Sequence, residues 1–117
     1  MTTLRTASAA LIAFALSSAV AAAPVGNIAA GKDKATKVCS ACHGADGNKT
    51  LDGSYPRLAG QYPDYLTKAL TDYRSGKRKN PIMMGQAQGL TDQEIADVAA
   101  YFGSLDGEIH DLSGHQR

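Results

Sequence analysis

The sequence has few residues that bind metals, since it contains only two cysteines, Cys39 and Cys42, and three histidines. It also lacks a second C-x-x-C or an H-x-x-H spacing, which a tetrahedral zinc site normally supplies. Zinc bound by the cysteines with His43, His110 and His115 is therefore disfavoured. A thioredoxin-like redox pair would follow a strand in a βαβ unit, and no strand pattern precedes Cys39.

Charge of one sign is not in excess either. The chain has 12 Lys and Arg against 11 Asp and Glu, a net charge of +1 at pH 7. A nucleic-acid-binding domain would call for a strong basic excess. Strand-like alternation, internal repeats and low-complexity tracts are also missing after the first 22 residues, which indicates one small all-helical domain.

The N-terminus has the features of a secretory signal peptide over residues 1–22. Arg5 supplies the positive charge, residues 9–20 are apolar apart from two serines, and Ala19-Val20-Ala21 is a small-residue cleavage site. We expect cleavage after Ala21 or Ala22, export to the periplasm, and no membrane span in residues 23–117. An uncleaved anchor is the alternative, but the apolar segment is short for a hydrocarbon core of about 30 Å.

The chemistry-bearing motif is Cys39-Ser40-Ala41-Cys42-His43. Two thiols one helical turn apart can each add to a vinyl group of haem, and the next histidine can bind the iron. The sequence therefore predicts one covalent haem c. A chain this small buries little surface by itself, so the haem would also form the centre of its core.

Three helices are predicted around this motif, with room for a fourth. The first covers residues 29–42 and carries a stripe of small residues at Gly31, Ala35 and Cys39. The second begins at Pro63 and ends at Ser75-Gly76. The third begins at the capping box formed by Thr91 and Glu94, and its apolar face runs to Phe102. We expect a folded core over residues 29–105 and a loose polar tail over residues 106–117.

The iron has a sixth position, for which the chain offers Met83 and Met84. A thioether raises the reduction potential and keeps other ligands out. Both methionines fall in a segment predicted to be a loop that begins at a proline, where core filling is a weaker explanation for them.

Several motifs together resemble the class I cytochromes c, most closely the cytochrome c4 and c-553 type. The resemblance covers residues 31–105 and rests on G-x-x-x-A-x-x-x-C-S-A-C-H-G, D-G-N, Y-P-R-L-A-G-Q, N-P-I-M-M and L-T-D-Q-E-I-A-D-V-A-A-Y-F. It implies a small all-α fold wrapped around one haem c, with thioether bonds at Cys39 and Cys42 and His43 as the proximal iron ligand.

The resemblance also implies roles for neighbouring residues. The carbonyl of Pro56 would bind the second nitrogen of the proximal histidine, and Leu58 would pack on the haem. Gly31 would lie against Tyr101. The distal ligand of the family usually lies eight residues before the start of the last helix, which implies Met83, with Met84 as the competitor.

The expected function is that of a periplasmic electron carrier, monomeric and not an enzyme, which exchanges one electron with donor and acceptor proteins. Two-domain cytochromes c4 carry two haem motifs, whereas this chain has one, so it looks like the single-domain relatives. A permanent haem subunit of a dehydrogenase, for example one that oxidises a sulfur compound, is an alternative. A haem sensor or enzyme with an open sixth site is a third. The basic stretch at residues 77–79 suits either a solvated loop or docking to an acidic partner.

Overall fold

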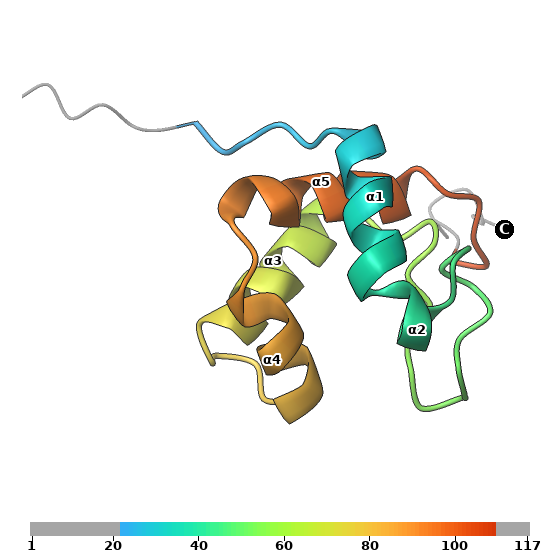
Figure 1. Cartoon of the computed structure of the whole chain (residues 1–117). Helices are drawn as coiled ribbons and strands as arrows, with labels where there is room; N and C mark the ends of the chain where they lie inside the picture. Colours follow the sequence, from blue (N-terminus) through green and yellow to red (C-terminus); the bar gives the residue numbers. More distant parts are fainter. Residues whose placement is uncertain (1–21, 110–117) are drawn as a thin grey trace, which may run out of the picture.

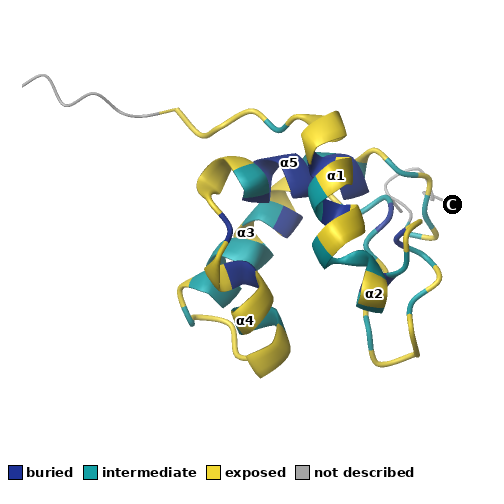
Figure 2. Cartoon of the chain, viewed as in Figure 1, coloured by how far each residue is buried: buried dark blue, intermediate teal, exposed yellow. Residues whose placement is uncertain are grey.

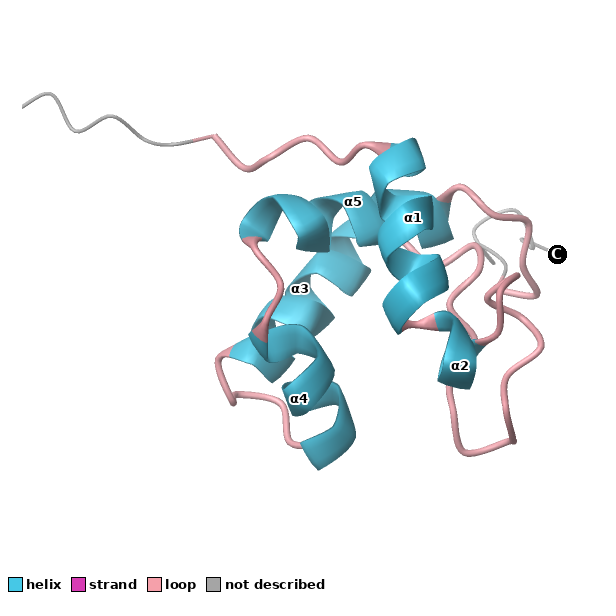
Figure 3. Cartoon of the chain, viewed as in Figure 1, coloured by secondary structure: helices cyan, strands magenta, loops and turns pink. Residues whose placement is uncertain are grey.

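The computed structural model describes residues 22–109 of the 117-residue chain (Figure 1). This part contains five helices and no strand (Figure 3), namely α1 (Ile28–Val38), α2 (Ser40–His43), α3 (Pro63–Arg74), α4 (Pro81–Gln88) and α5 (Asp92–Gly103). The all-α prediction is therefore confirmed. None of these helices is long and apolar enough to cross a membrane. The predicted signal peptide, apart from Ala22, and the histidines at 110 and 115 lie outside the described residues.

Helix α5 is the centre of the packing, because both α1 and α3 pack against it (Figure 1). Figure 2 shows the buried positions concentrated on α5 and on the faces of α1 and α3 that approach it. The largest fully buried side chains, Phe102 and Ile95, both come from α5. The main apolar cluster consists of Ala35, Leu66, Val98, Ala99, Tyr101 and Phe102.

Local capping explains where the helices begin. The Thr91 side chain accepts a hydrogen bond from the backbone N–H of Glu94, and the Glu94 carboxylate accepts one from the N–H of Thr91, so the predicted capping box at α5 is confirmed. Pro63 occupies the first turn of α3, also as predicted. Asn27 caps α1 by accepting a hydrogen bond from Ala30.

The crossing of α1 and α5 depends on a glycine. A Cβ built on Gly31 would lie 2.0 Å from the backbone oxygen of Asp97 and 2.9 Å from the Cβ of Tyr101. Gly31 thus lies against Tyr101, as the resemblance implies. The small-residue stripe lets the two helix backbones approach closely.

Two predictions about the elements were wrong. The segment with Met83 and Met84 is the helix α4, not a loop. Asn80 accepts a hydrogen bond from the backbone N–H of Met83, and Pro81 takes the first helical position, so the helix has a cap and a preorganised start. The predicted first helix is interrupted at Cys39, which separates α1 from the single turn of α2.

The beginning of the predicted loose tail is also ordered. Gly107 packs so closely on the loop before α3 that a Cβ there would lie 1.9 Å from the oxygen of Ala59. The carbonyl of Asp106 accepts a hydrogen bond from the Asn48 side chain, and Glu108 pairs with Arg57. Residues 106–109 therefore belong to the fold, because backbone contacts hold them although they bury little apolar surface. Residues 110–117 lie outside the described part.

Candidate cofactor site

The two cysteines lie at the junction of α1 and α2. Cys39 is half-buried and packs against the main apolar cluster, while Cys42 lies in α2 directly before His43. Burial raises the pKa of the Cys39 thiol to about 11, and the Lys34 ammonium offsets only part of this rise. Neither cysteine takes part in a disulfide bond. Both thiols therefore remain available for thioether bonds.

His43 is buried, with 5% of its surface exposed. Its Nδ1 lies 2.8 Å from the carbonyl oxygen of Pro56, the contact that the resemblance implies. Because a carbonyl only accepts hydrogen bonds, this contact assigns the ring proton to Nδ1 and leaves the lone pair on Nε2. Nε2 is buried and has no hydrogen-bond partner in the described part of the chain. A buried nitrogen lone pair without a partner is unusual in a folded protein, and it suits an iron ligand.

The loop before α3 brings Pro56 to this position. The backbone N–H groups of Leu58 and Ala59 both donate to the carbonyl of Gly47, and the N–H of Gly60 donates to the carbonyl of Phe102. Gly47 adopts a φ of 67°, which a side chain would strain. These bonds tie the loop to α5 and present the Pro56 carbonyl to the imidazole.

A cavity of about 460 Å³ adjoins the cysteines and His43. In Figure 1, α2 and α4 lie at the same end of the molecule, and residues from both helices line this cavity. Most of the other lining residues come from the loop at 54–61 and from α3. The lining includes Cys39, Cys42, His43, Tyr55, Pro56, Leu58, Tyr65, Leu66, Tyr73, Arg78, Ile82 and Met83.

The two methionines differ in their placement. Met83 lines the cavity, whereas Met84 is absent from its lining. The terminal methyl of Met84 instead lies 3.9 Å from the position of a Cβ on Gly76, in the turn after α3. The helical geometry of α4 separates the two side chains, because successive residues on a helix point about 100° apart.

A haem fits this set of residues. The site offers two thiols one turn apart, an imidazole nitrogen without a partner, and a thioether, which are the groups that hold haem c in proteins. Aliphatic, aromatic and sulfur-containing side chains form most of the cavity lining, and they suit a flat apolar macrocycle. Within residues 22–109, no cluster of three or more His, Cys, Asp or Glu side chains suits another metal ion.

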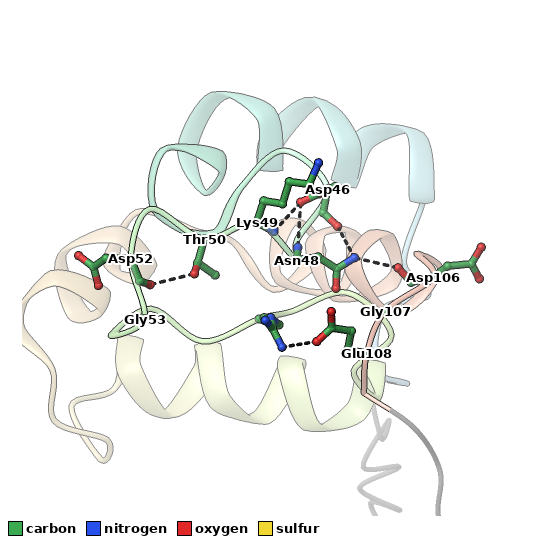
Figure 4. A pocket seen from close by; sticks show the side chains of 10 residues that line it. Asp46, Asn48, Lys49, Thr50, Asp52, Gly53, Asp106, Gly107 and Glu108 are labelled. Atoms are coloured by element: carbon green, nitrogen blue, oxygen red, sulfur yellow. Dashed lines mark hydrogen bonds and ion pairs between the residues drawn. The ribbon is translucent and has the colours of Figure 1, made fainter.

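A second hollow, of about 680 Å³, lies between the loop at 46–57 and residues 106–108 (Figure 4). Most of its polar groups bind one another, although the buried Oδ1 of Asn48 has no hydrogen-bond partner within residues 22–109. The Asp46 carboxylate accepts hydrogen bonds from the N–H groups of Asn48 and Lys49, and Arg57 pairs with Glu108. The backbone bonds lower the pKa of Asp46. This hollow is open and lies apart from the cysteines, so it is a product of loop packing.

A domain of this size, all-helical, with a C-x-x-C-H motif on the wall of an apolar cavity, is a c-type cytochrome by architecture. The chain belongs to the cytochrome c family, whose sequence model matches residues 28–106. It carries one C-x-x-C-H motif and therefore binds one covalent haem c.

Bacterial cytochromes are among the relatives of this chain. The chain is 51% identical over 83 residues to cytochrome c4 of Thiocapsa roseopersicina, a match that covers 70% of this chain and 42% of the relative. It is 48% identical over 82 residues to cytochrome c-554(548) of Halomonas halodenitrificans, a match that covers 68% of this chain and 96% of that relative. The crystal structure of reduced recombinant cytochrome c4 from Pseudomonas stutzeri superimposes on this structure with a TM-score of 0.66 at 40% sequence identity. The superposition covers 73% of this chain and 48% of the cytochrome c4 chain. The chain thus spans about half, or less, of the length of the cytochrome c4 relatives that it matches.

Some lining residues were not identified from the sequence. Tyr55 packs edge-on to the His43 ring, with the ring centroids 6.2 Å apart. Tyr65 and Tyr73 fit the apolar stripe of α3 but line the cavity instead of entering the main cluster. In the sequence, Arg78 is simply part of a basic stretch. Such a stretch does not indicate whether an arginine lines a cavity or lies in solvent.

Proposed function

We propose that this protein is a periplasmic one-haem electron carrier. The observation that carries the proposal is the placement of His43 and Met83 on the wall of one cavity, with Nε2 of the histidine buried and without a partner. Haem c supplies a reversible one-electron change at its iron. The chain must hold this group, fill its axial positions and keep water away.

In this proposal, Cys39 and Cys42 form the two thioether bonds and His43 is the proximal ligand. The Pro56 carbonyl keeps the imidazole proton on Nδ1 and orients the ring, so that Nε2 remains a ligand in both oxidation states. Met83 is the distal ligand and Leu58 is a pocket residue. If His43 and Met83 both held the iron, no position would remain for a gas or a substrate, which suits a carrier better than a sensor or an enzyme.

Small structural change between oxidation states favours fast electron exchange, and the ligands come from elements with strong local restraints. His43 ends a turn that is joined to α1, and Met83 lies three residues after the Asn80 cap. These local restraints would favour a small rearrangement with each electron once the haem is bound.

We further propose that partners bind briefly and are recognised by charge. Arg74 is already paired with Asp92, but Lys77 and Lys79 form no ion pair within residues 22–109. These two lysines lie beside the cavity-lining segment and would attract an acidic surface on a redox partner. A monomer that meets a donor and an acceptor in turn agrees with this arrangement.

The test is an absorbance spectrum and a redox titration of the purified mature protein. We expect one covalent haem per chain, a weak band near the red end of the oxidised spectrum from methionine coordination, and a reversible one-electron titration. Protein without haem, or reduced protein that readily binds carbon monoxide, would contradict the proposal. Size exclusion of the protein from its host would distinguish a free monomer from a permanent subunit of a dehydrogenase.

A further inference from the structure

Arg78 lies in the segment between α3 and α4, and its side chain lines the same cavity as His43 and Met83. Among residues 22–109, the lining contains one other arginine, Arg57, whose guanidinium is paired with the carboxylate of Glu108. Arg78, by contrast, forms no ion pair with any residue between 22 and 109. The described part of the cavity therefore contains one guanidinium whose charge is not matched by a contacting carboxylate.

Arg78 is nevertheless held in place. Its guanidinium carbon lies 4.9 Å from the centroid of the Tyr73 ring, within the range of a cation–π contact. Its Nη1 donates to the hydroxyl of Tyr65 at 3.4 Å, and its backbone N–H donates to the carbonyl of Asp72 at 3.0 Å. Because Arg has five N–H donors in a planar fork, most of its donors have no partner among residues 22–109. Two aromatic residues of α3 thus orient a cation that has donors to spare.

We propose that Arg78 binds a propionate carboxylate of the haem. The proposal rests on the haem function proposed above and adds a residue that positions and tunes the cofactor. Haem carries two carboxylates, and a carboxylate at the edge of a mostly apolar cavity needs a charged hydrogen-bond donor to offset its lost hydration. A guanidinium is well suited, because it can bind both carboxylate oxygens at once.

This contact has a redox consequence. An unneutralised carboxylate near the iron stabilises the oxidised form, which carries one more positive charge than the reduced form. By pairing with the carboxylate, Arg78 reduces this preference and raises the reduction potential. The effect of Arg78 on the reduction potential depends on the position of its guanidinium in the cavity and not only on the net charge of the protein.

The test compares the reduction potentials of the holoprotein variants Arg78→Gln, Arg78→Lys and Lys79→Gln. Arg78→Gln and Lys79→Gln lose the same charge from adjacent positions, but Lys79 does not line the cavity. We expect Arg78→Gln to change the one-electron equilibrium constant about threefold or more towards oxidised protein, where tenfold corresponds to 59 mV. Lys79→Gln should cause less than half of that shift in potential. The resonance Raman band of the propionate bending vibration should move in Arg78→Gln and stay unchanged in Lys79→Gln.

Arg78→Lys is the second variant, for the case that Arg78→Gln does not mature. It keeps the charge but loses the planar fork, so we expect a potential close to wild type together with a shifted propionate band. Equal shifts of potential in Arg78→Gln and Lys79→Gln, or an unchanged propionate band in both Arg78 variants, would overturn the proposal. Each variant is compared only after its haem content and methionine band match those of wild type. Failure of the Arg78 proposal is therefore distinct from failure of the carrier function, which would already show in the wild-type spectrum.

Discussion

Gly31 determines how closely α1 can approach α5, because its missing side chain leaves room for the backbone of the other helix. A Cβ at this position would lie 2.0 Å from the oxygen of Asp97, far inside normal contact distance, and the atom it meets is backbone. Relief of the clash would require α1 to move away from the main apolar cluster. Close packing of this kind tolerates added volume poorly.

We therefore expect Gly31→Ala to destabilise the protein by about 1–3 kcal/mol, the usual cost of overpacking. Gly85 provides the matched control, since it also lies in a helix but a Cβ there would meet nothing within 4 Å. Gly85→Ala should raise stability by about 0.4–1 kcal/mol, because alanine restricts the unfolded chain more than glycine does. Urea denaturation of the two holoproteins measures both changes, and a neutral Gly31→Ala would show that the helices can separate at little cost.

The methionines give a second prediction at this scale. Met83→Leu should abolish the red-end absorbance band and lower the reduction potential, since leucine has no donor atom for the iron. Met84→Leu conserves volume at a position that does not line the cavity, so it should leave the band in place. If the band disappears with Met84→Leu and survives Met83→Leu, the distal ligand is the other methionine, and α4 must rotate by about 100° when haem is bound.

At the scale of the element, one carboxylate at the start of α5 makes two interactions. Glu94 closes the capping box and also forms an ion pair with Lys34 of α1, at 2.6 Å. The Lys34 contact and the hydrogen bond from the backbone of Thr91 lower the pKa of Glu94 from 4.5 to about 2. The carboxylate thus links the N-terminus of α5 to α1.

Glu94→Gln separates these contributions, because glutamine can still close a capping box but cannot form the ion pair. A carboxyl group with a lowered folded-state pKa stabilises the protein above its unfolded value, and this stabilisation is lost as the pH falls through the folded value. The free energy of unfolding should therefore be higher in wild type than in Glu94→Gln above about pH 5, and the difference should shrink towards zero near pH 2. Lys34→Gln should show the same pH dependence. A difference between wild type and Glu94→Gln that does not change between pH 6 and pH 2 would contradict the ion-pair explanation.

The same elements show what could be predicted from the sequence. The starts of α3 and α5 were predicted because capping chemistry is local and is carried by Pro63, Thr91 and Glu94. Asn80-Pro81 is the same kind of signal, yet the helix after it was predicted to be a loop, because its apolar residues do not recur at helical spacing. Helix α4 has no wide apolar face to reveal it, and its packing against α3 is a tertiary contact that single-sequence periodicity does not contain.

The candidate site also contains both residues that the sequence predicts and residues that it does not. Cys39, Cys42 and His43 could be predicted because the attachment chemistry requires them next to one another in the chain. Arg78 could not, since its position depends on the turn at Gly76, with a φ of 74°, and on two tyrosines of α3. Contacts that form only when separate elements pack together leave no local pattern.

At the scale of the whole molecule, the packing is uneven. Helix α5 joins α1 and α3 into one unit, whereas α4 packs chiefly on α3, and α2 chiefly on α1 (Figure 1). Both α2 and α4 contribute to the wall of the cavity, and within the described residues each has one main packing partner. Only two large side chains are fully buried elsewhere in the described residues. A haem in this cavity would therefore supply apolar surface shared by α2 and α4.

A chain with Cys39→Ala and Cys42→Ala, produced without haem, should accordingly lose its cooperative unfolding transition, because the remaining core is too small for a net stability of about 5 kcal/mol or more. The loss should also be uneven along the chain. Hydrogen exchange followed by mass spectrometry should show the greatest loss of protection in α4 and α2, and the least where α1 crosses α5, since that contact needs no haem. Uniform protection in the haem-free chain, or a sharp unfolding transition like that of the holoprotein, would mean that the helices hold their arrangement on their own and that the cavity exists before the haem is attached.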